Sequence, residues 1–578
     1  MIAVFLSKNR RARESDMEGM ISKHNNIIIE GKLGIVTEGH DTVLNNDRFL
    51  ALLDSDLYEN DNTFLERLVS SFEANGKECL KLINGSFAFV IWDKKDERLH
   101  MAIDKLGIKD IFYHNTDTGL FAASRIRTLL RSPNISKAID TEALSQYLCY
   151  QFVPKPLTMF KGIRKVPATE CLIMSNGRLF FEKYYDFIFS DTQEDENECA
   201  KGVRDSLEEA TKSRMKGKQG ILLSGGLDST IIASILRDNG SSSRIHSFTG
   251  GFEGVDSYES FDFGTKVADE MGFENNEIVI KDDAIQTLPQ LYSFMDEPMA
   301  DSAIIQSHIM FSEARKKVKT IFSGEFSDII FAGMQNYAIS RVERGFWNII
   351  NESQREDIMN TPGTYVTSEF INNVKKRAPF RHYKHGEIFF NNGNLEGLAN
   401  PYFYEQFKSF DLAKPIESVY TRCKSNVGLN KEIYTDLYLA SQRRLYHMTE
   451  PAKMHGIRLM LPFTDSRVIE HSLRIPANMK INSTSQKCIL RKAFNGRIPE
   501  YVRRRRKEGF TMPFSKWYNS SYDWIFEQLE RTDMVFFDKS GIEDRVKKIV
   551  HSKTMNYEKN MYVWIFLNFV VWKNAMGI

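Results

Sequence analysis

The stretch GILLSGGLDS, residues 220–229, decides the fold. A short apolar run that ends in two glycines is typical of a buried strand, and the apolar spacing that follows it is typical of a helix. The same order of strand and helix returns further along the chain, where strands alternate with helical stretches. This alternation predicts a doubly wound parallel sheet. The segments concerned are SRIHSFTGGF (243–252), SYESFDFGTKVADEMG (257–272), ENNEIVI (274–280) and KTIFSGEFSD (319–328).

The residues on either side of this region have different patterns. From Ile329 to Ile578 the chain is mostly helical in pattern, whereas residues up to about 190 form short apolar runs separated by turn residues, which predict stacked antiparallel sheets. The acidic stretch IFSDTQEDENE (188–198) is typical of a surface linker. We therefore expect two domains, 1–190 and 191–578, in a chain that is α+β at the front and α/β behind. The front strands are expected in MIAVFLS (1–7), NNIIIEGKLGIV (25–36), GSFAFVIWD (85–93) and RLHMAID (98–104).

Composition excludes several classes of protein. The chain has 578 residues, with 77 Lys and Arg against 76 Asp and Glu, and this balance argues against a dedicated nucleic-acid binder. No apolar run reaches the length of a membrane span; the closest, WIFLNFVVW (564–572), is expected to be a buried helix. Six scattered cysteines without a CxxC pair favour reduced thiols in a cytoplasmic protein. They are Cys79, Cys149, Cys171, Cys199, Cys423 and Cys488.

The turn at residues 224–229 carries the strongest chemical signal. Its two glycines, Gly225 and Gly226, allow backbone N–H groups to surround an anion, and the helix that starts near Asp228 directs its positive end to the same point. Ser224 and Ser229 add hydroxyl donors. Since the Asp228 carboxylate would repel a bare phosphate, a bridging Mg²⁺ is expected.

This turn resembles the pyrophosphate loop of the N-type ATP pyrophosphatases, and further motifs are similar to those of the asparagine synthetase family. The resemblance implies that ATP binds to Ser224, Gly225, Gly226, Leu227, Asp228 and Ser229, with adenine near Phe248, Thr249 and Gly250. The further motifs are Asp296-Glu297-Pro298 with Asp301-Ser302, Ser323-Gly324-Glu325-Phe326-Ser327-Asp328, Leu461-Pro462-Phe463-Thr464-Asp465, Lys487 to Arg491, and Arg506-Lys507-Glu508-Gly509-Phe510.

Adenylation chemistry gives roles to three of these side chains. Asp228 and Asp328 are the carboxylates expected to hold Mg²⁺, which draws charge from the α-phosphate. Lys487 is expected to neutralise charge on the phosphates and on the later tetrahedral intermediate. Asp328 is also suited to cap the helix that follows it.

The front of the chain resembles the N-terminal-nucleophile (Ntn) glutaminase domain of the same family. The resemblance rests on LINGSFAFVIWD (82–93) and DKLGIK (104–109). Working relatives attack glutamine with a cysteine after the initiator methionine, but this position is Ile2, which has no nucleophilic atom. Their glutamine-holding segment is also degraded here, to DSDLYE (54–59). We expect an Ntn-hydrolase-like antiparallel β-sandwich without glutaminase activity, followed by the doubly wound ATP pyrophosphatase domain.

The second half-reaction needs a base for the incoming amine. Glu325 stands where asparagine synthetases have an acid and β-lactam synthetases a tyrosine. Tyr446 is expected to pair with it, unless Glu325 acts alone or Glu450 assists instead. Phe326 replaces a usual glycine, so it either reshapes the acyl pocket or is neutral packing.

The resemblance implies an ATP- and Mg²⁺-dependent amide-forming ligase. Relatives without the cysteine include lasso-peptide macrolactam cyclases and β-lactam synthetases, so ring closure within one peptide or small-molecule carboxylate is the leading expectation. A precursor peptide with its processing proteins would then be the partner, and neither nucleic acid nor membrane would be. Residues 335–445, rich in aromatic and basic side chains, either bind that partner or are simply a family interval. Ammonia-dependent asparagine formation and a catalytically inactive regulatory relative are the alternatives.

Overall fold

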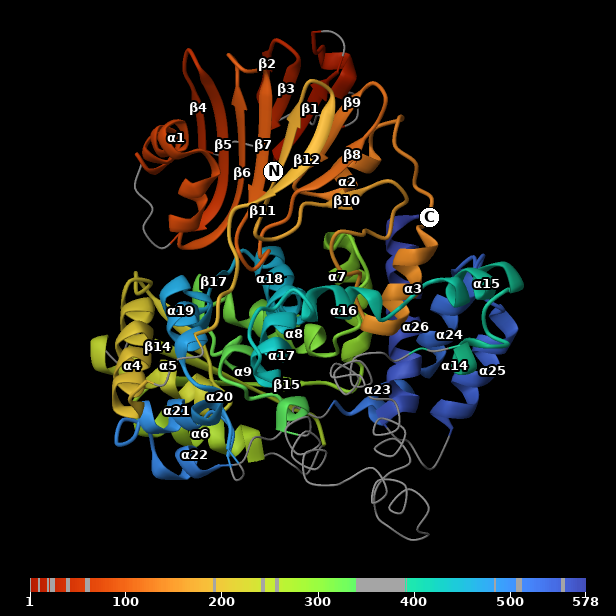
Figure 1. Cartoon of the computed structure of the whole chain (residues 1–578). Helices are drawn as coiled ribbons and strands as arrows, with labels where there is room; N and C mark the ends of the chain where they lie inside the picture. The colour runs from red at the N-terminus through yellow and green to blue at the C-terminus, as the bar shows by residue number, and fades with distance from the viewer. Residues whose placement is uncertain are drawn as a thin grey trace, which may run out of the picture.

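Two stacked antiparallel sheets and one parallel sheet organise the molecule, as shown in the computed structural model of Figure 1. The structure describes residues 2–8, 11–17, 20, 26–37, 42–57, 63–190, 194–240, 245–254, 259–338, 390, 392–482, 485–505, 512–551 and 557–578. Both antiparallel sheets lie in the upper part of Figure 1 and the parallel sheet lies in the lower part among helices. The predicted fold class is therefore confirmed.

The antiparallel sheets have six strands each. The first has the order β10 (Arg164–Lys165), β8 (Phe112–Asn115), β9 (Gly119–Ala123), β1 (Ile2–Ser7), β3 (Leu33–Thr37) and β2 (Asn26–Glu30). The second has the order β12 (Arg178–Lys183), β11 (Glu170–Ser175), β7 (Arg98–Ile103), β6 (Gly85–Asp93), β5 (Phe49–Leu57) and β4 (Thr42–Asn45).

Strand β1 shows why these sheets stack. Successive side chains of a strand point to opposite faces. Ile2 and Val4 therefore enter the core between the two sheets, where they meet residues of β6 such as Val90. Ala3 and Phe5 point the other way, into the core shared with helix α3 (Thr141–Tyr150).

The parallel sheet has five strands, all paired in parallel. Their order is β15 (Glu274–Ile280), β14 (Ile245–Phe252), β13 (Gln219–Leu222), β16 (Thr320–Phe322) and β17 (Arg458–Met460). From β13, the chain first adds β14 and β15 on one side of the sheet, and then adds β16 and β17 on the other side. The helices around this sheet include α4 (Glu196–Lys212), α5 (Leu227–Asn239), α6 (Glu259–Met271), α7 (Leu288–Phe294), α8 (Ala303–Ala314), α9 (Ser327–Ile330), α16 (Lys414–Tyr420), α17 (Gly428–Tyr438), α18 (Ala440–Met454), α19 (Ser466–Arg474), α20 (Ala477–Lys480), α21 (Cys488–Ala493) and α26 (Tyr557–Met576).

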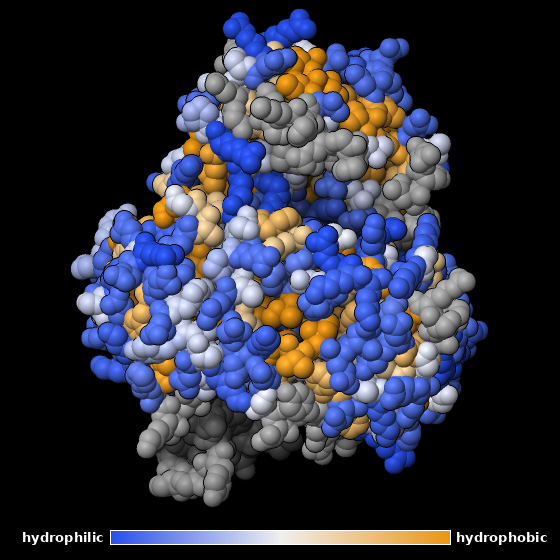
Figure 2. Space-filling view, turned by 180° about the vertical axis from the view of Figure 1, so that it is seen from behind, coloured by the Kyte–Doolittle hydropathy of each residue, from blue (hydrophilic) through white to orange (hydrophobic). Residues whose placement is uncertain are grey.

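Further helices complete the two parts. They are α1 (Phe64–Asn75), α2 (Ile126–Leu130), α14 (Asn392–Leu395), α15 (Pro401–Ser409), α22 (Glu500–Arg504), α23 (Phe514–Ser520), α24 (Tyr522–Arg531) and α25 (Lys539–Val550). Seen from behind, the surface is mostly hydrophilic, with hydrophobic patches on the upper and the lower part (Figure 2).

Helix α26 is buried in the largest core, as expected for its apolar run. Its polar atoms hold distant segments: Trp564 Nε1 donates to the carbonyl of Ala300 at 2.9 Å, and Trp572 Nε1 donates to that of Asp296 at 3.0 Å. The Tyr147 hydroxyl of α3 donates to Ile565 O at 2.8 Å. Within the described residues, the structure has no helix both long and apolar enough to cross a membrane.

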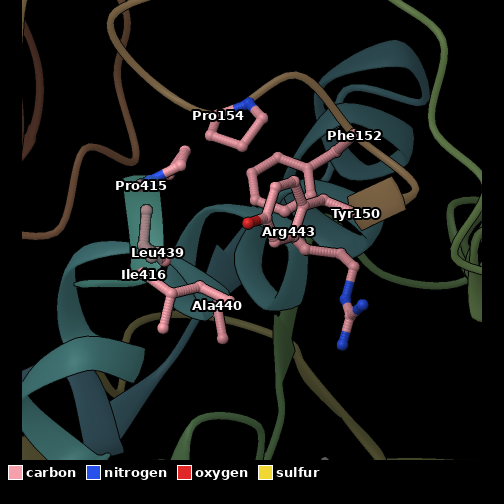
Figure 3. A pocket seen from close by; sticks show the side chains of 8 residues that line it. All are labelled: Tyr150, Phe152, Pro154, Pro415, Ile416, Leu439, Ala440 and Arg443. Carbon is pink, nitrogen blue, oxygen red and sulfur yellow. The ribbon is translucent and has the colours of Figure 1, made fainter. Parts of the chain in front are cut away.

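An apolar pocket lies where the chain after α3 meets helices α16 and α18 (Figure 3). It is partly open to solvent and small, with a cavity volume of about 10 Å³. The stem of Arg443 forms one wall, and its guanidinium lies 3.6 Å from the Asp301 carboxylate. The other lining residues are Tyr150, Phe152, Pro154, Pro415, Ile416, Leu439 and Ala440.

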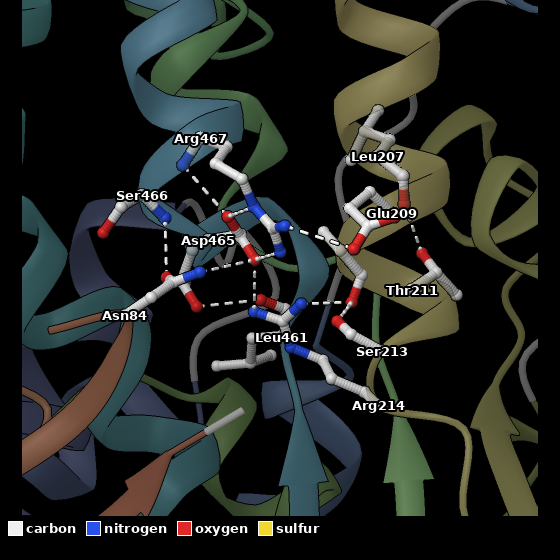
Figure 4. A network of polar contacts seen from close by, with 12 residues as sticks. Asn84, Leu207, Glu209, Thr211, Ser213, Arg214, Leu461, Asp465, Ser466 and Arg467 are labelled. Carbon is white, nitrogen blue, oxygen red and sulfur yellow. Dashed lines mark hydrogen bonds and ion pairs between the residues drawn. The ribbon is translucent and has the colours of Figure 1, made fainter. Parts of the chain in front are cut away.

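A buried ion-pair network joins the front sheets to the rear part (Figure 4). Asp465 pairs with Arg214 at 3.0 Å, and both side chains are fully buried. Asp465 also pairs with Arg467 at 2.9 Å and accepts a hydrogen bond from Asn84, which precedes β6, at 3.1 Å. The backbone N–H of Ser466 donates to the Asn84 amide oxygen at 3.0 Å, so Asn84 is held on both sides.

A second set of ion pairs joins the same two parts. Asp296 pairs with Arg125 at 3.0 Å, and Glu297 pairs with Lys165 at 2.5 Å. Arg125 reaches Glu450 of α18 at 3.2 Å. Because a buried charge that loses its partner is costly, these pairs favour the observed placement of the sandwich on the rear part.

Candidate active site

The candidate site lies at the carboxyl end of the parallel sheet, between β13 and β16. Strand order reverses at this point, and ligands of open parallel sheets bind in the crevice formed there. The loop after β13 carries Ser224 and Gly225, and the loop after β16 carries Ser323 and Gly324. The predicted sheet thus brings two motifs about 100 residues apart to one edge.

Glycine is required at both loops. Gly225 has φ +68°, and a Cβ there would lie 2.6 Å from the carbonyl carbon of Phe263 in α6. A Cβ on Gly324 would lie 2.7 Å from both the Asp228 carbonyl carbon and the Ser229 nitrogen. The two loops and the start of α5 therefore pack backbone against backbone, an approach that only glycine allows.

The phosphate-binding turn is internally hydrogen-bonded. Ser224 Oγ lies 3.2 Å from Ser229 Oγ and accepts the Gly226 N–H at 3.3 Å. Leu227, the first residue of α5, is buried in the core. The helix therefore starts at Leu227 and directs its N-terminal amides to the crevice, where they are suited to bind phosphate.

Asp228, Asp328 and Lys487 form one cluster. The Lys487 ammonium pairs with the carboxylate of Asp228 and lies 2.6 Å from Asp328 Oδ1. Ser327 Oγ donates to the other oxygen of Asp228 at 2.7 Å. Lys487 is only 4% exposed. Burial lowers its pKa, but the two carboxylates outweigh burial and raise the pKa above its ordinary value, so Lys487 stays charged.

The backbone around this cluster is strained. Phe326, Ala332 and Lys487 have φ values of +81°, +55° and +55°, in the left-handed region that side chains other than glycine rarely adopt. A Cβ on Gly333 would overlap Lys487 Cε and Asp328 Oδ1. Left-handed residues of this kind cost about 1–3 kcal/mol each and gather at functional sites.

The predicted adenine-side residues lie on the neighbouring strand. The Phe248 side chain is buried in a core cluster with Met310 of α8, so only its backbone faces β13 and β15. Thr249 Oγ1 donates to Leu223 O at 3.0 Å, and a Cβ on Gly250 would lie 2.8 Å from Met310 Sδ. The structure thus puts all three residues on β14, the strand next to β13, and their role in binding adenine stays a prediction.

The proposed base and its partner lie on different elements. The half-buried Glu325 donates its backbone N–H to Ser323 Oγ at 3.2 Å. Tyr446 is on α18, and burial and the nearby charge of Glu450 raise its pKa well above the ordinary value. Within the described part of the chain, no hydrogen bond joins Tyr446 to Glu325, so their pairing stays a prediction.

Glu450 is held elsewhere. It pairs with Lys453 at 2.7 Å and with Arg125 at 3.2 Å. Burial raises the pKa of Glu450, but these two cations hold it below its ordinary value. Glu450 therefore acts as an anion in the junction between the two parts of the molecule.

Sequence reasoning missed what several motif residues do. Asp296, Glu297 and Asp465 matched family motifs, yet the structure places Asp296 and Glu297 in ion pairs between the two parts, and Asp465 in an ion pair within the rear part and a hydrogen bond to Asn84 of the front part. Ser327 and Gly333 were given no role in the site, although Ser327 donates a hydrogen bond to Asp228 and Gly333 leaves room for the Lys487 side chain. Segment 506–511 and most of 335–445, namely 339–389 and 391, lie outside the described residues.

The front of the chain contrasts with this site. Ile2 begins β1, is 3% exposed and hydrogen-bonds through its backbone to Ser124. Lys109 pairs with Asp54 and Asp56, at 2.8 and 3.0 Å, in the degraded glutamine-holding segment. Cys79 is the first cysteine of the chain, and burial raises the pKa of its thiol to about 11.

The chain matches the Asparagine synthase family over residues 202–574 and the Glutamine amidotransferase domain over residues 34–185. It belongs to the asparagine synthase family. It is 27% identical over 542 residues to glutamine-hydrolyzing asparagine synthetase 1 of Bacillus subtilis (strain 168), covering 89% of this chain and 81% of that protein. Identity to asparagine synthetase 3 of the same organism is 24%, over 79% of this chain and 71% of that protein.

Members of the asparagine synthase family are carbon–nitrogen ligases that split ATP into AMP and pyrophosphate, generally with Mg²⁺. The donor set here fits that metal. Two carboxylates facing a phosphate-binding turn suit Mg²⁺, which is usually bound by one or two carboxylates together with substrate phosphates. In the described residues no group of three His, Cys, Asp or Glu is placed to hold a metal ion.

Proposed function

We propose that the protein is an amide-forming ligase that adenylates a carboxylate and joins it to an amine of the same substrate, without glutaminase activity. A peptide macrolactam is our leading product, ahead of a β-lactam. One observation carries the proposal: the complete Asp228–Lys487–Asp328 cluster occurs in a chain with isoleucine at position 2. We also propose 1–190 and 191–578 as its domains.

Each part of the crevice has a task in adenylation. The amides of Gly225 and Gly226 and the start of α5 bind the phosphates, and Asp228 and Asp328 hold Mg²⁺. When bound, Mg²⁺ withdraws charge from the phosphate oxygens. Lys487 balances the charge that develops as pyrophosphate leaves. Phe248 to Gly250 offer backbone groups to adenine.

Loss of glutaminase activity is supported by the chemistry of the front half. Ile2 offers no nucleophile, and burial raises the pKa of the Cys79 and Cys171 thiols to about 11 and about 12. Burial also raises the pKa of the Cys149 thiol. Because the thiolate is the reactive form, these cysteines cannot replace the missing nucleophile.

The amine must then lose a proton before it attacks. Glu325 is half-buried beside the crevice and is our proposed base. Tyr446 is the proposed assistant, and its raised pKa would keep its phenol protonated and able to donate a hydrogen bond.

The apolar pocket of Figure 3 supports a substrate larger than aspartate. Its apolar lining would contact an apolar part of a peptide or small-molecule carboxylate at the protein surface. Arg444, next to Arg443, lies with its guanidinium 3.8 Å from Met334 Sδ, and the Met334 carbonyl accepts the Gln486 amide at 2.8 Å. We propose a precursor peptide in the cytoplasm as the partner, rather than nucleic acid or membrane.

Ammonia-dependent formation of asparagine is the second candidate. It is favoured by the names of the relatives, which are asparagine synthetases. An inactive regulatory relative is the third, but the retained ion pairs and left-handed residues of the crevice argue against it, since they cost stability.

Substrate-dependent exchange between ATP and labelled pyrophosphate tests the proposal. We expect exchange with candidate peptides, a product lighter by one water, and no ammonia from glutamine. Formation of asparagine from aspartate and ammonia would refute ring closure and support the second candidate function. Lack of exchange with every carboxylate would favour the regulatory protein.

A further inference from the structure

The Lys487 ammonium lies between two carboxylates that belong to different loops. It pairs with Asp228, at the start of α5, and with Asp328, in the first turn of α9. Two carboxylates that converge on one cation are also what a divalent metal requires. One positive group and two negative groups leave the cluster with a single net negative charge.

We propose that Lys487 occupies the position of the divalent cation in the nucleotide-free protein, so that the metal enters only together with a polyphosphate. This inference rests on the proposed ATP site. The incoming phosphates offer Lys487 new oxygen partners, the ammonium moves to them, and the metal takes its place between Asp228 and Asp328.

The surroundings of Lys487 support this exchange of cations. Ser327 Oγ holds Asp228 Oδ1, so the second oxygen of this carboxylate is directed to the ammonium. Gly333 provides the space, because a Cβ would overlap Lys487 Cε. Arg491 adds positive charge near Asp228. A divalent metal that approached without phosphates would therefore meet a buried, charged ammonium at close range, and like charges repel strongly in such surroundings.

Lysine is suited to such a movement. Its ammonium is a compact point charge with three donors on a flexible stem, and it binds phosphate readily. Lys487 directly precedes the first residue of α21, and its carbonyl accepts the Arg491 N–H at 3.1 Å, so its backbone is anchored while its long side chain extends to the two carboxylates.

A titration with Mn²⁺ in the absence of nucleotide tests the proposal. Binding is measured as the decrease of the electron paramagnetic resonance signal of free Mn²⁺. We expect K487M to bind Mn²⁺ at least tenfold more tightly than the wild type, because the carboxylates lose their competing cation. K492M is the matched control: Lys492 is on the same helix, pairs with Glu196 at 2.8 Å at the surface, and should behave as the wild type. Adding D328N to K487M should abolish the gained site.

Equal Mn²⁺ affinity of the wild type and K487M would overturn the proposal. A folded state is checked by circular dichroism, and K487Q replaces K487M if the latter unfolds. A separate titration with Mn²⁺ and a non-hydrolysable ATP analogue tests the proposed function. If the wild type does not bind that complex, the ATP site itself is refuted, whereas an intact complex with equal affinities for Mn²⁺ alone refutes only the role of Lys487.

Discussion

The sandwich and the parallel sheet differ in what their key residues contribute: packing in the sandwich, and charge and backbone strain in the parallel sheet. In β1, Ile2 packs with Val4 in the core between the sheets, so an apolar residue at this position serves the fold. At the edge of the parallel sheet, Phe326 and Lys487 have left-handed backbone conformations, and Lys487 also carries a buried charge. Both features lower the stability of the fold. An apolar residue at position 2 is therefore explained by packing alone, whereas strained and charged residues such as Lys487 are typical of a functional site.

The largest expected effect breaks the rear site. D228N removes one metal-binding carboxylate and one partner of Lys487, so we expect ATP–pyrophosphate exchange to fall by about 10³-fold, or ~4 kcal/mol. D238N is the control, because Asp238 lies in the last turn of the same helix and pairs at the surface with Arg497 and Arg237. Exchange that survives in D228N would contradict the proposed metal site.

The next largest effect is expected in the network of Figure 4, which joins the two parts of the molecule. D465A leaves Arg214 buried without this partner, and breaking a buried ion pair costs about 3–5 kcal/mol. We expect the free energy of unfolding measured with urea to fall by this amount, and the midpoint of unfolding to fall with it. D205N, a surface change in α4, should cost no more than ~0.5 kcal/mol. An unchanged midpoint for D465A would show that the two parts hold together without the network of Figure 4.

A stabilising change is expected in the rear part. Lys480 is 0% exposed, and burial lowers its pKa to about 7. Since this folded pKa lies below the value of about 10.4 in the unfolded chain, the cost of Lys480 is full below pH 7 and disappears as the pH rises toward 10.4.

K480M removes that cost. We expect it to raise the free energy of unfolding at pH 7 by roughly 1–3 kcal/mol, with a smaller gain at pH 9.5. K547M, at the exposed face of α25, should give no such gain. A gain for K480M that is the same at both pH values would show that the lysine is not destabilising through its charge.

The smallest expected effect on stability concerns position 2 of the sandwich. I2C should cost about 1 kcal/mol, because it removes buried apolar volume from β1. It should release no ammonia from glutamine, since Asp54 and Asp56 remain paired with Lys109. Glutamine hydrolysis by I2C would show that the front domain retains its pocket and lacks only one atom.

The sequence was sufficient for the parts of the fold that repeat a local pattern. The alternation around residues 220–229 predicted the parallel sheet, which the structure confirms, whereas the phosphate site assigned to the glycines of the turn stays a prediction. Both signals are local: apolar spacing sets the elements, and Gly225 marks a left-handed turn.

Side-chain contacts between distant elements could not be predicted in the same way. Asp465 and Asp296 carry the same motif signal as Asp228, yet only the packing of distant segments decides that they bind Arg214 and Arg125. The pairing of Tyr446 with Glu325 was inferred by counting residues, and counting does not fix which face of α18 carries Tyr446.

The hydrogen bonds of helix α26 have a consequence for the order of folding. Its Trp564 and Trp572 hold the carbonyls of Ala300 and Asp296, across 264 and 276 residues of sequence. Contacts that close such long loops form slowly. The segment between α7 and α8 therefore reaches its final position late, so that a growing chain can assemble its sandwich and its phosphate-binding turn well before it can carry out a full reaction cycle.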